Sequence, residues 1–157
     1  MKGIFSVLVE NKDGALSTIA GLFARRGFNI DSLAVGETDD KSISSMTIVS
    51  TGDQRTIDQV EKQLNKKVDV IKVRRLAEAR SVCLEMILIK VSYSASTRSS
   101  LVELCNITGA KIVKAAAKYL MIEYHSDPEN VNDFIKLVKS FGIIEVQRTG
   151  AIAMEKD

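Results

Sequence analysis

The hydrophobic pattern in the first half of the chain predicts alternating strands and helices. Residues 4–10 form a β-rich apolar run with the length of a buried strand, and after a turn at 11–14 apolar residues recur at helical spacing up to Phe23. Arg25-Arg26-Gly27 ends this helix with cations in its last turn and a glycine just beyond it. The pattern then predicts a strand at 30–35, a hairpin loop at 36–41, a strand at 46–51, a helix at 57–64 that begins after Gly52-Asp53, and a strand at 68–73.

The second half repeats this order. It predicts a strand at 83–91, a helix capped by Ser96-Thr97 and closed by Gly109, a strand around 112–113 with a hairpin partner at 119–124, a helix at 128–138, and a final strand at 143–154. Asp127-Pro128-Glu129 places an N-cap, a proline at the first helical position and an acid in the first turn. The two halves share a pattern and not a residue-by-residue repeat.

The predicted fold class is therefore α+β, with two tandem ferredoxin-like βαββαβ domains. We expect the first domain at 1–76 and the second at 81–157, with the polar segment Leu76–Ser81 between them. Each half is small enough to be marginal alone. In each predicted sheet the helices cover one face only. Because the first strand carries apolar residues on both sides, we expect the second face to be covered by dimerisation.

Composition narrows the classes of function. The net charge of +2, from 22 Lys and Arg against 20 Asp and Glu, gives no strong attraction to nucleic acid or to an anionic membrane. No apolar run is long enough to span a membrane, and the N-terminus does not have the pattern of a signal peptide. Cys83 and Cys105 form no CxxC pair, so we expect reduced thiols and a cytoplasmic location.

The sequence offers no catalytic set. His125 is the one histidine, and no Walker A, GxGxxG or metal-ligand spacing is present. RNA-recognition domains share the βαββαβ order, and the basic segment 66–75 fits a nucleic-acid reading. The predicted central strands, however, provide only Phe5 for base stacking. A solvated edge strand explains the basic segment better.

The turn at residues 10–16 is the candidate binding site. Gly14 lies where the chain enters the helix, and free N–H groups at a helix start favour a carboxylate. Asn11 can donate and accept hydrogen bonds, and Asn29 with Ile30 begins the next strand. In a dimer, this turn and a neighbour's Asn29 could wall one pocket. On these residues alone, an ordinary turn with Asp13 as the N-cap is the simpler interpretation.

A longer set of residues carries a resemblance to a known family. The set consists of residues 6–11, 14–16, 21–23, 26–30, 32–33, 38–40, 46–48 and 59–66, followed more loosely by 144–146 and 148–150. In this spacing the chain resembles the acetohydroxyacid (acetolactate) synthase small subunit, with an N-terminal ACT domain and a C-terminal small-subunit domain. The resemblance covers essentially the whole chain.

The resemblance implies a regulatory subunit without catalysis of its own, acting in valine and isoleucine biosynthesis. Such subunits dimerise through their ACT domains, activate the catalytic subunit, and confer feedback inhibition by valine, or by leucine or isoleucine. No cofactor is expected in this chain, because thiamine diphosphate, magnesium and FAD belong to the catalytic partner.

The resemblance also implies roles for six residues. Gly14 and Ala15 would offer backbone N–H groups to the effector carboxylate, and Asn11 and Asn29 of opposite subunits would bind its polar end. Leu16 and Ile30 would flank its aliphatic side chain. Glu37 stands where many relatives carry proline, and Ser45 where many carry arginine, so we expect contacts with the catalytic subunit to differ there. A stand-alone amino-acid-binding ACT protein that regulates another enzyme is the alternative, followed by an RNA-binding ferredoxin-like module.

Overall fold

The computed structural model describes all residues, 1–157, as two compact units. The first unit comprises Met1–Cys83 together with Ala151–Asp157, and the second comprises Leu84–Gly150. The last seven residues therefore pack with the first unit, whereas the sequence pattern placed them in the second. No helix is both long and apolar enough to cross a membrane.

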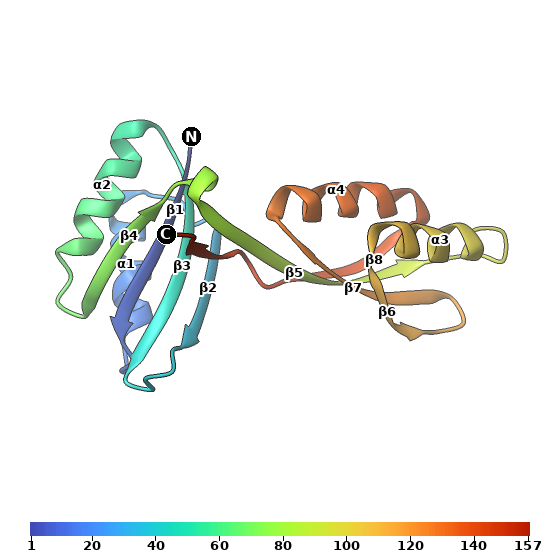
Figure 1. Ribbon diagram of the computed structural model, residues 1–157, viewed down its shortest axis with the longest axis horizontal. Coiled ribbons are helices and arrows are strands. Elements are labelled where there is room, and N and C mark those ends of the chain that lie inside the picture. The colour runs from blue at the N-terminus through green and yellow to red at the C-terminus, as the bar shows by residue number, and fades with distance from the viewer. The chain divides into compact units, whose positions relative to one another are not determined.

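The first unit has the predicted βαββαβ order. Its elements are β1 (Lys2–Glu10), α1 (Ala15–Arg26), β2 (Ser32–Glu37), β3 (Ile43–Thr51), α2 (Gln54–Asn65) and β4 (Val70–Leu76). The strands form an antiparallel sheet in the order β2-β3-β1-β4, and both helices lie on one of its faces (Figure 1). This is the split-βαβ arrangement expected of an ACT domain.

Alternation along β1 builds two cores on the two faces of this sheet. Phe5, Val7 and Val9 pack with the helices in the main core, whereas Ile4 faces the other way. Ile4 is only 2% exposed because it lies in a second cluster with Val49, Leu76 and Ala151. The chain's own C-terminal segment thus covers part of the face for which the sequence analysis expected a dimer partner.

The C-terminal segment is held to the first unit by polar contacts as well. The Ala151 N–H donates to Ser32 Oγ at 2.9 Å, and the Ala153 N–H donates to Thr47 Oγ1 at 3.3 Å. Arg74 forms a 3.5 Å ion pair with Glu155. These contacts fix the last strand against β2, β3 and β4.

The second unit repeats the order. After a 3₁₀ turn at Glu78–Arg80, its elements are β5 (Ser81–Ser92), α3 (Arg98–Thr108), β6 (Lys111–Ala115), β7 (Tyr119–Ser126), α4 (Pro128–Val138), a 3₁₀ turn at Lys139–Phe141, and β8 (Ile143–Arg148). The strand order β6-β7-β5-β8 matches that of the first sheet. The last strand, β9 (Ile152–Glu155), belongs to the first unit and pairs with β5. The fold class predicted from the sequence, two ferredoxin-like units, is confirmed.

The final strand differs from the prediction of one element at 143–154. It is divided into β8 and β9 at Thr149–Ala151, where Gly150 has a φ of +77°. A left-handed residue interrupts the pleat, so the chain changes direction before it pairs again. On either side of this break, β8 belongs to the second unit and β9 to the first.

Candidate functional site

The N-terminus of α1 is open. Gly14 is the residue before the helix, with a φ of +83°, and a β-carbon added there would meet no atom within 4 Å. The first helical hydrogen bond runs from the Thr18 N–H to the Gly14 carbonyl, so the amides of Leu16 and Ser17 precede the hydrogen-bonded ladder. Such amides, with the positive end of the helix dipole, favour a carboxylate.

No side chain caps these amides, and none caps α3, whereas α2 and α4 each begin with a capping aspartate. Asp53 accepts from the Thr56 N–H at 2.7 Å, and Asp127 accepts from the Glu129 and Asn130 N–H groups at 3.0 Å. Asp13 makes no such bond to α1. The simpler interpretation of the turn, with Asp13 as the N-cap, is therefore wrong for this structure, and Gly14 takes the N-cap position.

The next two residues are placed for different tasks. Ala15 is 5% exposed and its N–H donates to the Lys12 carbonyl at 3.3 Å, so neither its side chain nor its amide is free for a ligand. Leu16 is 46% exposed, so its side chain is available for apolar contact. The turn thus offers donors for an anion next to an exposed aliphatic side chain.

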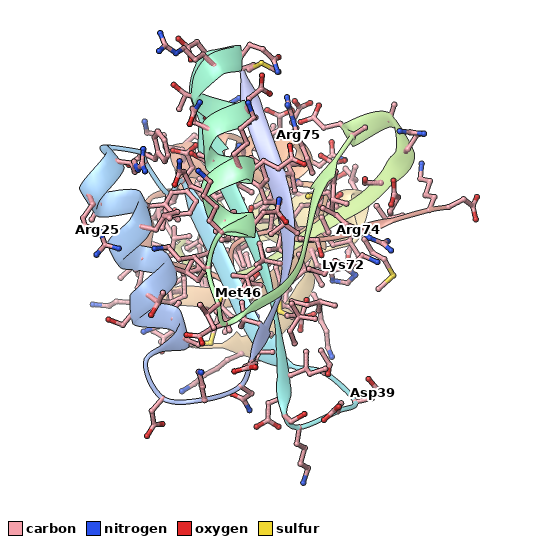
Figure 2. All side chains as sticks on the ribbon, turned by 90° about the vertical axis from the view of Figure 1, so that its left-hand side faces the viewer. Arg25, Asp39, Met46, Lys72, Arg74 and Arg75 are labelled. Atoms are coloured by element: carbon pink, nitrogen blue, oxygen red, sulfur yellow. The ribbon has the colours of Figure 1, made fainter.

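Asn11 ties this turn to the loop between β2 and β3. Its backbone N–H donates to the Ser42 carbonyl at 2.7 Å, and its side-chain Nδ2 donates to the Lys41 carbonyl at 2.8 Å. Nδ2 also lies 3.3 Å from Glu37 Oε1. Figure 2 shows Asp39 at the outer end of the same loop. Asn11 therefore joins two segments that are far apart in the sequence.

Ion pairs and hydrogen bonds fix the charges around the turn. Lys12 Nζ lies 2.6 Å from Asp69 and 3.0 Å from Glu10, and these two carboxylates raise the pKa of Lys12. Asp40 accepts from the hydroxyl and the backbone N–H of Ser42, which lowers the pKa of Asp40. These groups are matched to partners within the chain.

Asn29 and Ile30 lie at the opposite end of the sheet. Asn29 donates through Nδ2 to Asp31, and its carbonyl accepts from Ser50 Oγ at 2.6 Å. Ile30 is half-buried against the main core. The Asp31 N–H bonds Val49, whereas Asn11 bonds Ser42, at the other end of β3. Since the seven residue steps from Ser42 to Val49 span about 23 Å of strand, one chain does not bring Asn11 and Asn29 together.

The structure therefore divides the six predicted residues into two groups. Asn11, Gly14, Ala15 and Leu16 lie together at the start of α1, and Asn29 with Ile30 lies at the start of β2. Sequence reasoning missed the contact of Glu37 with Asn11, because no local pattern signals a pairing across 26 residues.

No other set of side chains has the geometry of a catalytic or metal site. No three His, Cys, Asp or Glu residues are grouped as metal ligands. His125 is largely exposed, 3.8 Å from Glu123. In the second unit a shallow hollow lies against Leu88, Met121 and Gln147, on the sheet face that α3 and α4 leave open. Neither place holds a nucleophile beside a base.

Comparison with known proteins matches both halves of the chain. Residues 5–72 match the AHAS small subunit-like ACT domain, and residues 84–157 match the small subunit of acetolactate synthase. The structure is also similar to the crystal structure of the acetolactate synthase small subunit from Thermotoga maritima. The TM-score is 0.91 with 37% identity, covering 99% of this chain and 97% of that one.

Curated relatives agree over nearly the full length. The probable acetolactate synthase small subunit of Archaeoglobus fulgidus is 47% identical, covering 98% of this chain and 96% of the relative. The acetolactate synthase small subunit of Haemophilus influenzae is 40% identical, covering 99% and 96%. The chain therefore belongs to the family of acetolactate synthase small subunits, with an ACT domain as its first half.

Proposed function

We propose that this chain is the regulatory subunit of an acetolactate synthase, and that it senses a branched-chain amino acid at the start of α1. It has no catalytic role of its own. It binds and activates a catalytic subunit that carries thiamine diphosphate, magnesium and FAD, and it confers feedback inhibition by valine, or by leucine or isoleucine. Membership of the small-subunit family supports the regulatory role.

The observation that supports a sensor site is the open N-terminus of α1. Gly14 leaves free space over the turn, and the first amides of α1 have no side-chain cap. The amides at the start of α1 would receive the effector carboxylate, and the Ala15 N–H would exchange its bond to the Lys12 carbonyl for one to the ligand. The exposed Leu16 side chain would flank the aliphatic part of the effector.

A homodimer would complete the site through β2. This strand is an edge of the first sheet, and its sequence Ser-Leu-Ala-Val-Gly-Glu contains no lysine, arginine or proline to block pairing. The opposite edge, β4, carries Lys72, Arg74 and Arg75 (Figure 2). Antiparallel pairing of β2 with the same strand of a second copy places the start of one strand beside the end of the other.

This pairing accounts for the two separated groups of residues. Asn29 and Ile30 of the partner subunit would approach Glu37 and, through it, Asn11 of the first subunit. One effector would then bridge two chains. It would stabilise one dimer arrangement over another and shift the catalytic subunit through a coupling free energy of about 1–3 kcal/mol.

The test is calorimetric titration of valine, leucine and isoleucine into the full chain and two variants. In Gly14→Asp, the new carboxylate projects into the open space and repels the ligand carboxylate, so we expect binding to be lost. Gly109→Asp is the matched control, since Gly109 ends α3 with a φ of +77° and equally open surroundings. It carries the same backbone strain in the other unit and should bind normally.

The same variants are then assayed with the catalytic subunit. Gly14→Asp should still raise acetolactate formation, and valine should no longer inhibit it. Loss of activation together with inhibition would indicate misfolding, not a specific site. If the wild-type chain binds none of the three amino acids, alone or with the catalytic subunit, the sensor role is wrong and activation alone remains.

A further inference from the structure

Glu37 is an acidic side chain in contact with the proposed effector turn. It ends β2 opposite Ser44, is exposed, and places Oε1 3.3 Å from Asn11 Nδ2. No lysine or arginine forms an ion pair with it, whereas Glu10 and Asp69 both bind Lys12. Its charge is therefore available to a ligand.

The hydrogen bonds of Asn11 determine which of its atoms can face that ligand. A side-chain amide has two N–H donors and one oxygen acceptor. Both donors are used within the chain, one by the Lys41 carbonyl and one by Glu37. The Asn11 oxygen is then the free end of the amide, so the turn offers two acceptors here, Asn11 Oδ1 and the Glu37 carboxylate.

An amino acid has an ammonium with three donors beside its carboxylate. The amides at the start of α1 suit the carboxylate, and they offer nothing to the ammonium because they are donors themselves. Asp40 is engaged by Ser42, and Asp13 and Asp39 make no hydrogen bond or ion pair with Asn11. Glu37 is the acid that Asn11 holds in place.

We propose that Glu37 is a specificity-determining residue, whose carboxylate binds the α-ammonium of the effector together with Asn11 Oδ1. The inference rests on the proposed function and deepens it. The site selects a zwitterionic amino acid over the carboxylic acid of the same shape, because Glu37 attracts the ammonium and repels a ligand that carries only a carboxylate.

The test compares valine with isovalerate, which has the same carbon skeleton without the amino group. Both ligands are titrated into the wild type, Glu37→Gln and Asp39→Asn, by calorimetry and by NMR of the Asn11 side-chain amide. Glutamine keeps the length of the side chain and an oxygen for Asn11 Nδ2, so the loop is preserved. Asp39→Asn removes a charge from the same loop, and the Asn11 side chain bonds Glu37 and Lys41 and not Asp39.

We expect Glu37→Gln to weaken valine binding by about fivefold to tenfold, the size of an exposed ion pair with a charged hydrogen bond. Isovalerate should bind as well as before or more tightly, since the repulsion is gone. Asp39→Asn should leave the ratio between the two ligands unchanged.

Two results would overturn the inference while leaving the sensor intact. Unchanged valine binding in Glu37→Gln would mean that another group takes the ammonium. An equal loss for valine and isovalerate would mean that Glu37 only shapes the loop. A wild-type chain that binds no branched-chain amino acid is a different result, because it would remove the proposed function itself.

Discussion

The two units share a fold, but the turn that precedes the first helix differs between them. In the first unit the β1–α1 turn contains Gly14 in a left-handed conformation, and no side chain caps α1. In the second unit the corresponding turn, residues 93–97, has hydroxyl side chains in place of a glycine. Thr97 Oγ1 accepts from the Ser94 N–H at 2.9 Å within the turn, although no side chain caps α3 either. The two turns therefore differ in backbone conformation and in their side chains, and not in whether a side chain caps the helix.

The units also differ in the sheet face that their helices leave open. In the first unit Ile4, Val49 and Leu76 are buried there beneath the C-terminal segment. In the second unit Leu84, Met86 and Leu88 are 40–43% exposed on that face. The covered face should add to the stability of the first unit, and the exposed one should add little.

Truncation of matched side chains tests this difference, with the largest effect expected. Ile4 on β1 and Leu88 on β5 occupy equivalent strands and both point away from the helices. Ile4→Ala should destabilise the first unit by about 3 kcal/mol, because it leaves a cavity under the C-terminal segment. Leu88→Ala should cost about 1 kcal/mol or less.

Urea unfolding followed by amide hydrogen exchange measures each unit separately. A large cost for Leu88→Ala would show that another molecule covers the open face of the second unit in solution. A small cost for Ile4→Ala would show that the C-terminal segment does not cover the first unit as the structure has it.

The sequence pattern was sufficient for most of the fold, and it located the glycine turn of the candidate site. The periodicity of apolar residues predicted both βαββαβ halves, because each strand and helix buries one of its faces. It missed the division of the last strand at Gly150, although the polar residues 147–149 before the glycine interrupt the apolar pattern there. The glycine turn was visible as a local pattern, whereas the Asn11–Glu37 contact depends on how the β2–β3 loop folds back. Asn11 and Asn29 lie at opposite ends of the sheet, so the proposed site brings them together only through a second chain.

The two units also differ in how deeply an ion pair is buried. In the second unit Glu85 is 5% exposed and receives two hydrogen bonds from Arg148, at 2.7 and 2.8 Å. In the first unit Arg75 and Asp58 form a pair at 3.0 Å that is more open to water. Arg148→Ala should lower the free energy of unfolding by about 2–3 kcal/mol, because it leaves a buried carboxylate without a partner. Arg75→Ala should lower it by less than about 1 kcal/mol.

The double variant Glu85→Leu/Arg148→Met is the control for the buried pair. It removes both charges and should recover most of the loss in denaturant midpoint, since no unpaired carboxylate remains. Similar costs for Arg148→Ala and Arg75→Ala would indicate that water reaches Glu85 and that burial does not distinguish the two pairs.

The smallest effect concerns the helix starts themselves. Asp127→Ala removes the cap of α4 and should lower the free energy of unfolding by about 1 kcal/mol. Asp13→Ala should change it hardly at all, because Asp13 makes no bond to α1. Thermal and urea denaturation of the two variants measure the contrast. Equal losses would mean that Asp13 caps α1 in solution. A carboxylate of the chain would then occupy the amides that the proposed effector requires, and Asp13→Ala should in that case bind valine more tightly than the wild type.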